Sequence, residues 1–200
     1  MIRFLLSVLL AIGLSACSQN ADPDKADILA ALNDLATKKA CVSSTLFQAF
    51  PISKTNQTEA NQDIIQPFVE LGFIANKPDE YTLSEKGQLV YDKNQAGFCY
   101  TNQFKISDIS VVKKESDNNL PPGLSGVWYV RFNIEPESTE EWVLSSAMLQ
   151  VVSHLTPDQI TKTHSFTVRL AKKHGEEELI IADPRFSFNP GMRLNTKFTF

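Results

Sequence analysis

Hydrophobic residues follow three different patterns along the chain. Residues 4–14 form an almost unbroken apolar run, residues 24–71 place apolar side chains at helical spacing, and the chain from Gly97 onward alternates apolar and polar positions as β-strands do. The change of period predicts an α+β fold. We expect a helical unit over residues 27–96, followed by a unit with a small antiparallel sheet over residues 97–200.

The helical unit is predicted to contain three helices. The first spans residues 24–40, where Leu and Ile recur on one helical face, and Cys41 would follow its end. A short second helix is stopped by Pro51, because proline cannot continue a helix. The third runs from an N-cap at Thr58 to Gly72, a typical residue after a helix C-terminus.

Two short strands, "FIA" and "YTL", are predicted around a turn at residues 77–79. The segments "LGFI" and "YTLSEKG" are similar to the end of the third helix and the wing of the winged-helix family. The resemblance spans residues 27–92 and implies a winged-helix-like unit. The third helix carries Glu59 and Glu70 but no Arg or Lys, so the resemblance implies a protein-binding or structural unit rather than a DNA reader.

The second unit is predicted to form a sheet of about four antiparallel strands. Residues 97–115 alternate with a slip that indicates a β-bulge, and residues 127–136 alternate without interruption. Residues 164–183 predict a hairpin, and residues 191–200 predict a last strand. Over residues 139–155 a helix opened by a capping box is predicted, with a strand as the alternative.

The first apolar run has the build of an export signal. It follows Arg3, is too short to span a bilayer as a mature helix, and ends at small residues before Cys17. The segment "LSAC" resembles the lipobox of bacterial lipoproteins. That resemblance implies removal of residues 1–16 and lipidation of Cys17, whose acyl chains would hold the protein on a membrane. A polar tether over residues 17–26 follows.

The residue after Cys17 indicates which of the two bacterial membranes is expected to hold the protein. In enterobacterial-type lipoproteins an aspartate at this place favours retention in the inner membrane, and this chain has Ser18 instead. The resemblance therefore implies the outer membrane, with the protein on the inner leaflet and facing the periplasm. The alternative is a plain signal peptide in which Cys17 is incidental.

The net charge of the chain limits the classes of partner that it is expected to bind. The chain has 19 Lys and Arg against 23 Asp and Glu, a net charge of −4, and no extended basic cluster. Nucleic acid is therefore not expected as a partner, because its binding depends on many phosphate contacts by Lys and Arg. We expect contact with the membrane through the lipid anchor and with an envelope protein through the folded part.

Cys41 and Cys99 are the two cysteines that remain besides the expected anchor. An even pair in an oxidising compartment predicts a disulfide, which would tie the end of the first helix to the strand after the wing. A reactive thiol or a metal site are the alternatives. No histidine lies beside either cysteine, which disfavours the metal site.

No catalytic residues, metal site or cofactor are predicted. His154, His164 and His174 fall on different predicted elements and do not form a zinc ligand set. Ser110 and Lys113 match S-x-x-K, but in a strand these positions point to opposite faces. The sequence also contains neither a phosphate-binding loop nor a dinucleotide fingerprint.

One surface loop is a candidate for recognition. Pro121 and Pro122 stand shortly before Trp128 and Tyr129, which predicts an interaction loop or, alternatively, a rigid loop over a packed aromatic pair. We therefore expect a lipid-anchored periplasmic binding or accessory protein that acts through protein–protein contacts. The alternative is an envelope hydrolase with an unrecognised active site. A DNA-binding regulator is inconsistent with export.

Overall fold

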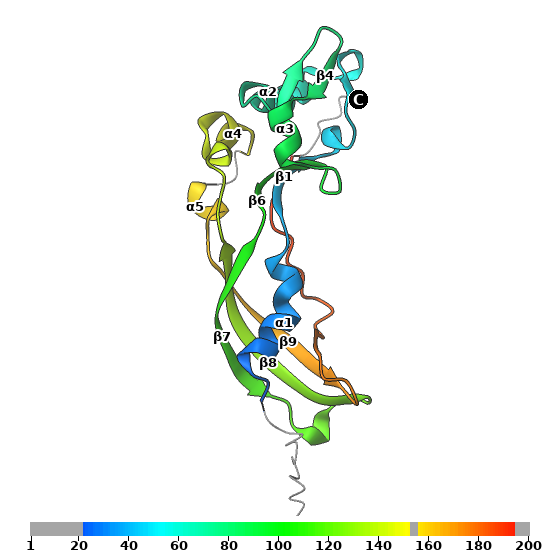
Figure 1. Ribbon diagram of the computed structural model, residues 1–200, viewed down its shortest axis with the longest axis vertical. Helices are drawn as coiled ribbons and strands as arrows, with labels where there is room; N and C mark the ends of the chain where they lie inside the picture. Colours follow the sequence, from blue (N-terminus) through cyan, green and yellow to red (C-terminus); the bar gives the residue numbers. More distant parts are fainter. Residues whose placement is uncertain (1–21, 153–155, 195–200) are drawn as a thin grey trace, which may run out of the picture.

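The alternating residues of the second half build a long, curved antiparallel sheet at one end of an elongated α+β molecule (Figure 1). The computed structural model describes residues 22–152 and 156–194. The strand order of the long sheet is β10-β9-β8-β7, which confirms the predicted antiparallel sheet. Its strands are β7 (Phe104–Lys114), β8 (Leu124–Pro136), β9 (His164–Lys173) and β10 (Leu179–Ile181).

Strand β8 follows the predicted alternation residue by residue. Trp128, Val130, Phe132 and Ile134 are buried, while Arg131 between them is exposed. In β7 the register shifts between Ser107 and Ser110, and Asp108 has a φ of 50°. This confirms the predicted bulge and is typical of an edge strand, where bulges obstruct pairing with another chain.

Helix α1 (Lys25–Ala36) covers the long sheet and lies against β7 and β10 (Figure 1). Asp24 caps it by accepting a hydrogen bond from the Asp27 amide at 2.8 Å. The prediction that this helix continues to residue 40 is wrong. The chain leaves the helix at Thr37, because Ala40 and the residues after it pair into a sheet.

A central sheet has the strand order β11-β1-β6-β5. Strands β1 and β11 are parallel, whereas the other pairs are antiparallel. The sheet joins strands from both predicted units, and the predicted boundary at residues 96–97 falls in the hairpin between β5 and β6. Its strands are β1 (Ala40–Ser44), β5 (Tyr91–Asp92), β6 (Gly97–Thr101) and β11 (Met192–Leu194). The predicted last strand is thus present over three residues, and its remainder lies outside the described residues.

Residues 45–90 form a separate lobe, here called the distal lobe, at the opposite end of the molecule from the long sheet (Figure 1). Its small sheet has the order β2-β4-β3, and the hairpin of β3 and β4 was predicted. Its elements are η1 (Thr45–Phe47), β2 (Ile52–Ser53), η2 (Lys54–Asn56), α2 (Glu59–Glu70), β3 (Ile74–Asn76), β4 (Glu80–Leu83) and α3 (Glu85–Val90).

Helix α2 begins and ends as predicted. The Thr58 hydroxyl accepts from the Asn61 amide at 3.2 Å, and Gly72 follows the helix with a φ of 75°. The predicted second helix before Pro51 is wrong, since only the three-residue turn η1 forms there. The residues before it are committed to β1, and the Ser44 hydroxyl caps the turn.

The structure does not show the predicted winged-helix unit. Helix α1, its expected first helix, lies against the long sheet and not beside α2 and α3. The distal lobe is instead built on aromatic residues that surround Phe98 of β6. The ring centroids of Phe47, Phe68 and Phe73 lie 5.3, 4.7 and 5.7 Å from that of Phe98. Such aromatic pairs add to the hydrophobic free energy of burial.

The segment for which helix and strand remained open is helical where the structure describes it. It contains η4 (Glu141–Leu144) and α4 (Ser146–Val151), and α5 (Pro157–Ile160) follows it. The predicted capping box at residues 138–141 is wrong, because the Ser145 hydroxyl begins a new helix by accepting from the Met148 amide at 3.3 Å. None of the described helices is long and apolar enough to cross a membrane.

Candidate functional site

A cavity of about 320 Å³ lies where the central sheet meets the long sheet. We call it the aromatic cavity. Its position follows from the chain topology, because β6 continues almost directly into β7 and carries residues from one sheet to the other. The residues that define it are Tyr100, Phe104, His164, Phe166, Phe188 and Met192, with Lys162 at its edge.

The cavity wall consists of aromatic rings that contact one another. The Phe188 centroid lies 5.1 Å from that of Phe104 and 5.8 Å from that of Phe166, both in edge-to-face geometry. His164 stacks on Phe166 with a centroid separation of 6.2 Å and an interplanar angle of 21°. Phe104 and Phe188 are buried and His164 is exposed, so the cavity runs from an apolar interior to a polar mouth.

The segment before β11 is fixed against the rest of the wall. The Lys38 ammonium donates a hydrogen bond to the Phe188 carbonyl and lies 5.9 Å from the centroid of the Phe188 ring. Gly191 has a φ of 105°, and a Cβ built there would come within 2.6 Å of the Cys41 carbonyl oxygen. Glycine is therefore required, because this backbone conformation and this close approach both exclude a side chain.

Tyr100 is one of the polar residues that line the cavity, together with Gln159, Ser187 and Asn189. Alternation along β6 places it on the same face as Phe98, and it is 4% exposed. Burial raises the pKa of Tyr100 to about 12, because a phenolate would lose its hydration there. Its hydroxyl makes no hydrogen bond with residues 22–152 and 156–194.

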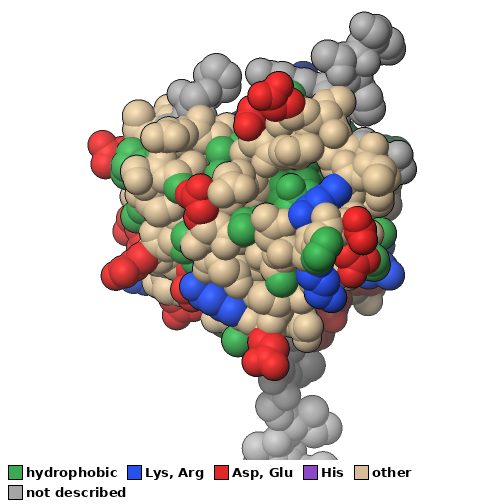
Figure 2. Space-filling view, turned by 90° about the horizontal axis from the view of Figure 1, so that it is seen from above, with side chains coloured by type: hydrophobic (Ala, Val, Ile, Leu, Met, Phe, Trp, Pro, Cys, Tyr) green, Lys and Arg blue, Asp and Glu red, His purple; other side chains and the backbone are tan. Residues whose placement is uncertain are grey.

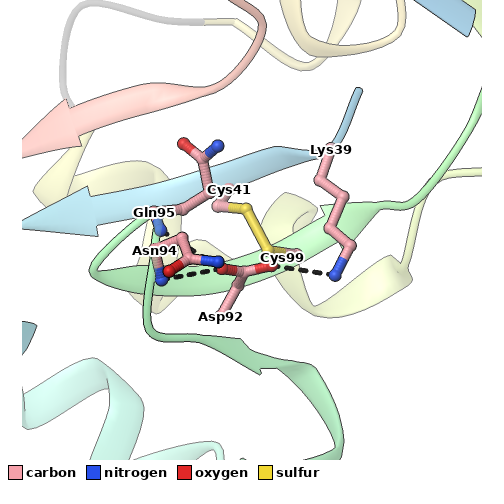
Figure 3. Close-up of polar contacts among 6 residues, drawn as sticks. All are labelled: Lys39, Cys41, Asp92, Asn94, Gln95 and Cys99. Atoms are coloured by element: carbon pink, nitrogen blue, oxygen red, sulfur yellow. Dashed lines mark hydrogen bonds and ion pairs between the residues drawn. A yellow bond between two sulfur atoms is a disulfide. The ribbon is translucent and has the colours of Figure 1, made fainter. Parts of the chain in front are cut away.

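A disulfide joins two strands beside this wall. Cys41 of β1 and Cys99 of β6 are directly opposite in the register, and their Cα atoms are 3.7 Å apart (Figure 3). The predicted pairing is therefore present, although Cys41 belongs to a strand and not to a helix end. Ala40 and Tyr100, the sequence neighbours of the two cysteines, both line the aromatic cavity.

An ion pair fixes the hairpin on the other side of the disulfide (Figure 3). The Lys39 ammonium lies 2.8 Å from Asp92 Oδ2, while Asp92 Oδ1 accepts from the amides of Asn94 and Gln95 at 2.9 and 3.2 Å. The hydrogen bond from Lys39 is the largest cause of a lowered pKa for the Asp92 carboxyl. This cluster stabilises the turn between β5 and β6 and thereby the position of Tyr100.

The predicted interaction loop is divided between two environments. Pro121 and Pro122 are exposed, but Trp128 is only 4% exposed and donates from Nε1 to Asp22 Oδ1 at 3.1 Å. Tyr129 lies on the other face of β8, with the Lys113 ammonium 5.1 Å from its ring centroid. These residues therefore do not form one recognition edge, because alternation along β8 separates the two aromatic rings.

The other candidate residues do not assemble into a reactive group. His164 is at the mouth of the aromatic cavity, whereas His174 is in the exposed turn after β9. Ser110 and Lys113 are exposed along β7. His154 and Cys17 lie outside the described residues. Within the described ranges no three His, Cys, Asp or Glu residues are grouped closely enough to hold a metal ion.

Sequence reasoning missed the aromatic cavity. Its residues come from β6, β7, β9 and β11, so no local motif unites them. The sequence contains 13 Phe residues, but this count does not indicate which of them the fold brings together. Comparisons with protein families, with curated proteins and with solved structures found no match to this chain.

Proposed function

We propose that this protein is a lipid-anchored periplasmic binding or accessory protein of the bacterial cell envelope, acting through protein–protein contacts. In this proposal, acyl chains on Cys17 hold it on the inner leaflet of the outer membrane. The observation that carries the proposal is the hydrogen bond from the Trp128 indole to Asp22 at the end of the long sheet. It fixes where the folded part begins relative to the proposed anchor.

The distance to the membrane follows from chain geometry. Asp22 is five positions after Cys17, so these residues reach at most about 18 Å when fully extended. Helix α1 begins at the end of the long sheet that is remote from the distal lobe (Figure 1). An anchored protein would therefore keep the long sheet near the bilayer and hold the distal lobe away from it, in reach of envelope proteins.

The surface of the distal lobe supports a protein partner. Residues 45–90 carry three basic and six acidic residues, a net charge of −3 that disfavours nucleic acid. Figure 2 looks onto this end and shows acidic, basic and hydrophobic side chains mixed across the surface.

Helix α3 presents an apolar side chain on a rigid support. Leu89 is 86% exposed. The helix beneath it is closely packed, because a Cβ at Gly87 would come within 2.0 Å of the Phe73 carbonyl oxygen. Lys86 also binds the end of α2, donating to the Leu71 carbonyl at 2.9 Å. A fixed apolar group loses little conformational entropy when a partner covers it.

Site-specific photo-crosslinking in cells tests this proposal. A benzophenone amino acid at position 89 of the full-length protein is expected to capture a specific envelope protein. The same group at Glu177, in the exposed turn near the proposed anchor, is the matched control and is expected to capture much less of it. Equal capture at both positions, or no specific product at either, would contradict binding through the distal lobe.

A further inference from the structure

The aromatic cavity has the composition of a ligand site. Tyr100 lines the cavity, and its side chain carries a hydroxyl group that makes no hydrogen bond with the described residues. A hydroxyl group can donate one hydrogen bond. An acceptor oxygen carried by a ligand would satisfy this donor.

The shape of the cavity favours a planar apolar group. Phe104, Phe166 and Phe188 supply ring faces and edges from three different segments, and Met192 adds a polarisable thioether. The volume of about 320 Å³ is near the lower limit of small-molecule sites, so one or two fused rings would fill it.

The charge around the cavity favours an acid. Lys162 lines the mouth and is exposed, and neither Asp nor Glu is among the residues that line the cavity. The Lys38 ammonium lies behind the wall, against the Phe188 ring. Two ammonium groups therefore lie at the mouth and behind the wall, while the nearby Glu135 carboxylate is held by Lys105 and the Thr163 hydroxyl.

We propose that the aromatic cavity binds a small planar aromatic carboxylate. Its rings would contact Phe166 and Phe188, and a carboxylate oxygen would accept a hydrogen bond from the Tyr100 hydroxyl. Lys162 would stabilise the negative charge from the mouth. This site is separate from the distal lobe, so ligand binding and partner capture are independent properties of the molecule.

Methyl NMR with 2-naphthoate as the probe tests the proposal on the full-length protein, solubilised in a non-ionic detergent and labelled at its methionine methyl groups. Met192 lines the cavity, whereas Met148 is fully buried in α4 outside it. Naphthoate is expected to shift the Met192 signal in a saturable manner and to leave the Met148 signal in place. No shift at Met192, or equal shifts at both residues, would overturn the proposal.

Two variants test the assigned contacts. Tyr100→Phe is expected to weaken naphthoate binding about fivefold, the effect of one hydrogen bond, while the protein stays folded. Lys162→Gln is expected to weaken it about twofold, as for an exposed ion pair. Tyr81→Phe, at a buried tyrosine of β4 outside the cavity, is the control and should leave binding unchanged. Unchanged affinity in Tyr100→Phe would overturn the proposal, whatever the crosslinking at position 89 shows.

Discussion

The Trp128 indole donates a hydrogen bond to the Asp22 carboxylate at 3.1 Å, across 106 residues of sequence. Trp128 is held by the core of the long sheet, and Asp22 is the first described residue of the chain. The contact therefore ties the beginning of the folded part to the sheet end from which helix α1 starts. If the chain is anchored at Cys17, this contact determines which end of the molecule faces the membrane.

Asp22→Ala is expected to lower the free energy of unfolding by about 1 kcal/mol, because it removes the acceptor of this hydrogen bond. The emission of Trp128 should change as well, since the carboxylate contacts its indole. Urea denaturation followed by tryptophan fluorescence measures both effects. Asp34→Ala, at an exposed carboxylate of α1, is the control and should change stability by less than about 0.5 kcal/mol. Equal effects of the two substitutions would contradict a specific contact.

Replacing both Cys41 and Cys99 with alanine is expected to lower stability by about 4 kcal/mol. This value follows from the loss of a cross-link between residues 58 positions apart, in the chain-entropy description. Chemical denaturation of the variant and of the oxidised protein measures the difference. Thiol labelling of unfolded, unreduced protein should find neither cysteine free. Stoichiometric labelling of either one would refute the disulfide in the native protein.

Gly191→Ala is expected to destabilise the protein by more than about 2 kcal/mol, because strain at positive φ is added to a steric clash. The new Cβ would lie 2.6 Å from the Cys41 carbonyl oxygen and 2.8 Å from the Cys41 backbone nitrogen. Gly123→Ala is the matched control, since Gly123 has a φ of 88° and nothing within 4 Å of a built Cβ. Gly123→Ala should lower the free energy of unfolding by about 1 kcal/mol. Thermal unfolding of both variants then separates the effect of the clash at position 191 from the effect of positive φ. A Gly191→Ala protein as stable as Gly123→Ala would show that β11 does not pack tightly on β1.

Stability at alkaline pH should depend on Tyr100. Its pKa is raised from 10.0 to about 12 in the folded protein, so the folded state holds the phenol proton more tightly than the unfolded state does. The contribution is fully present below pH 10 and is lost as pH rises toward 12, a total of about 3 kcal/mol. Urea denaturation between pH 9 and pH 11.5 should therefore show a steeper loss in the wild type than in Tyr100→Phe. Parallel curves would mean that the phenol is hydrated in the native state.

The elements that the sequence predicted correctly are those whose pattern is local. Strand β8 alternates from Trp128 to Ile134, and α2 carries its own cap at Thr58 and its own stop at Gly72. Strand β1 escaped prediction because the helix before it is followed directly by "ACVSS", with neither Gly nor Pro between them. Its partners β6 and β11 are remote in sequence, so the pairing that makes it a strand leaves no local trace.

The difference between local and remote patterns also explains why the disulfide was predicted and the aromatic cavity was not. The disulfide could be predicted from the expected export, because an even pair of cysteines in an oxidising compartment has few alternatives. The aromatic cavity was not, since Tyr100 of β6 and Phe188 of the segment before β11 are ordinary apolar residues until the fold brings these segments together. The expected winged-helix unit is not shown for a similar reason, because α1 has the predicted helical period but packs on the long sheet.

The central claim is that the chain is anchored by lipid at Cys17 and presents its folded part from there. The intact mass of the full-length protein extracted from cell membranes tests it most directly. We expect a chain that begins at Cys17 and carries the mass of a diacylglyceryl group and an amide-linked acyl chain. A chain that retains residues 1–16, or one cleaved elsewhere and unmodified, would contradict it.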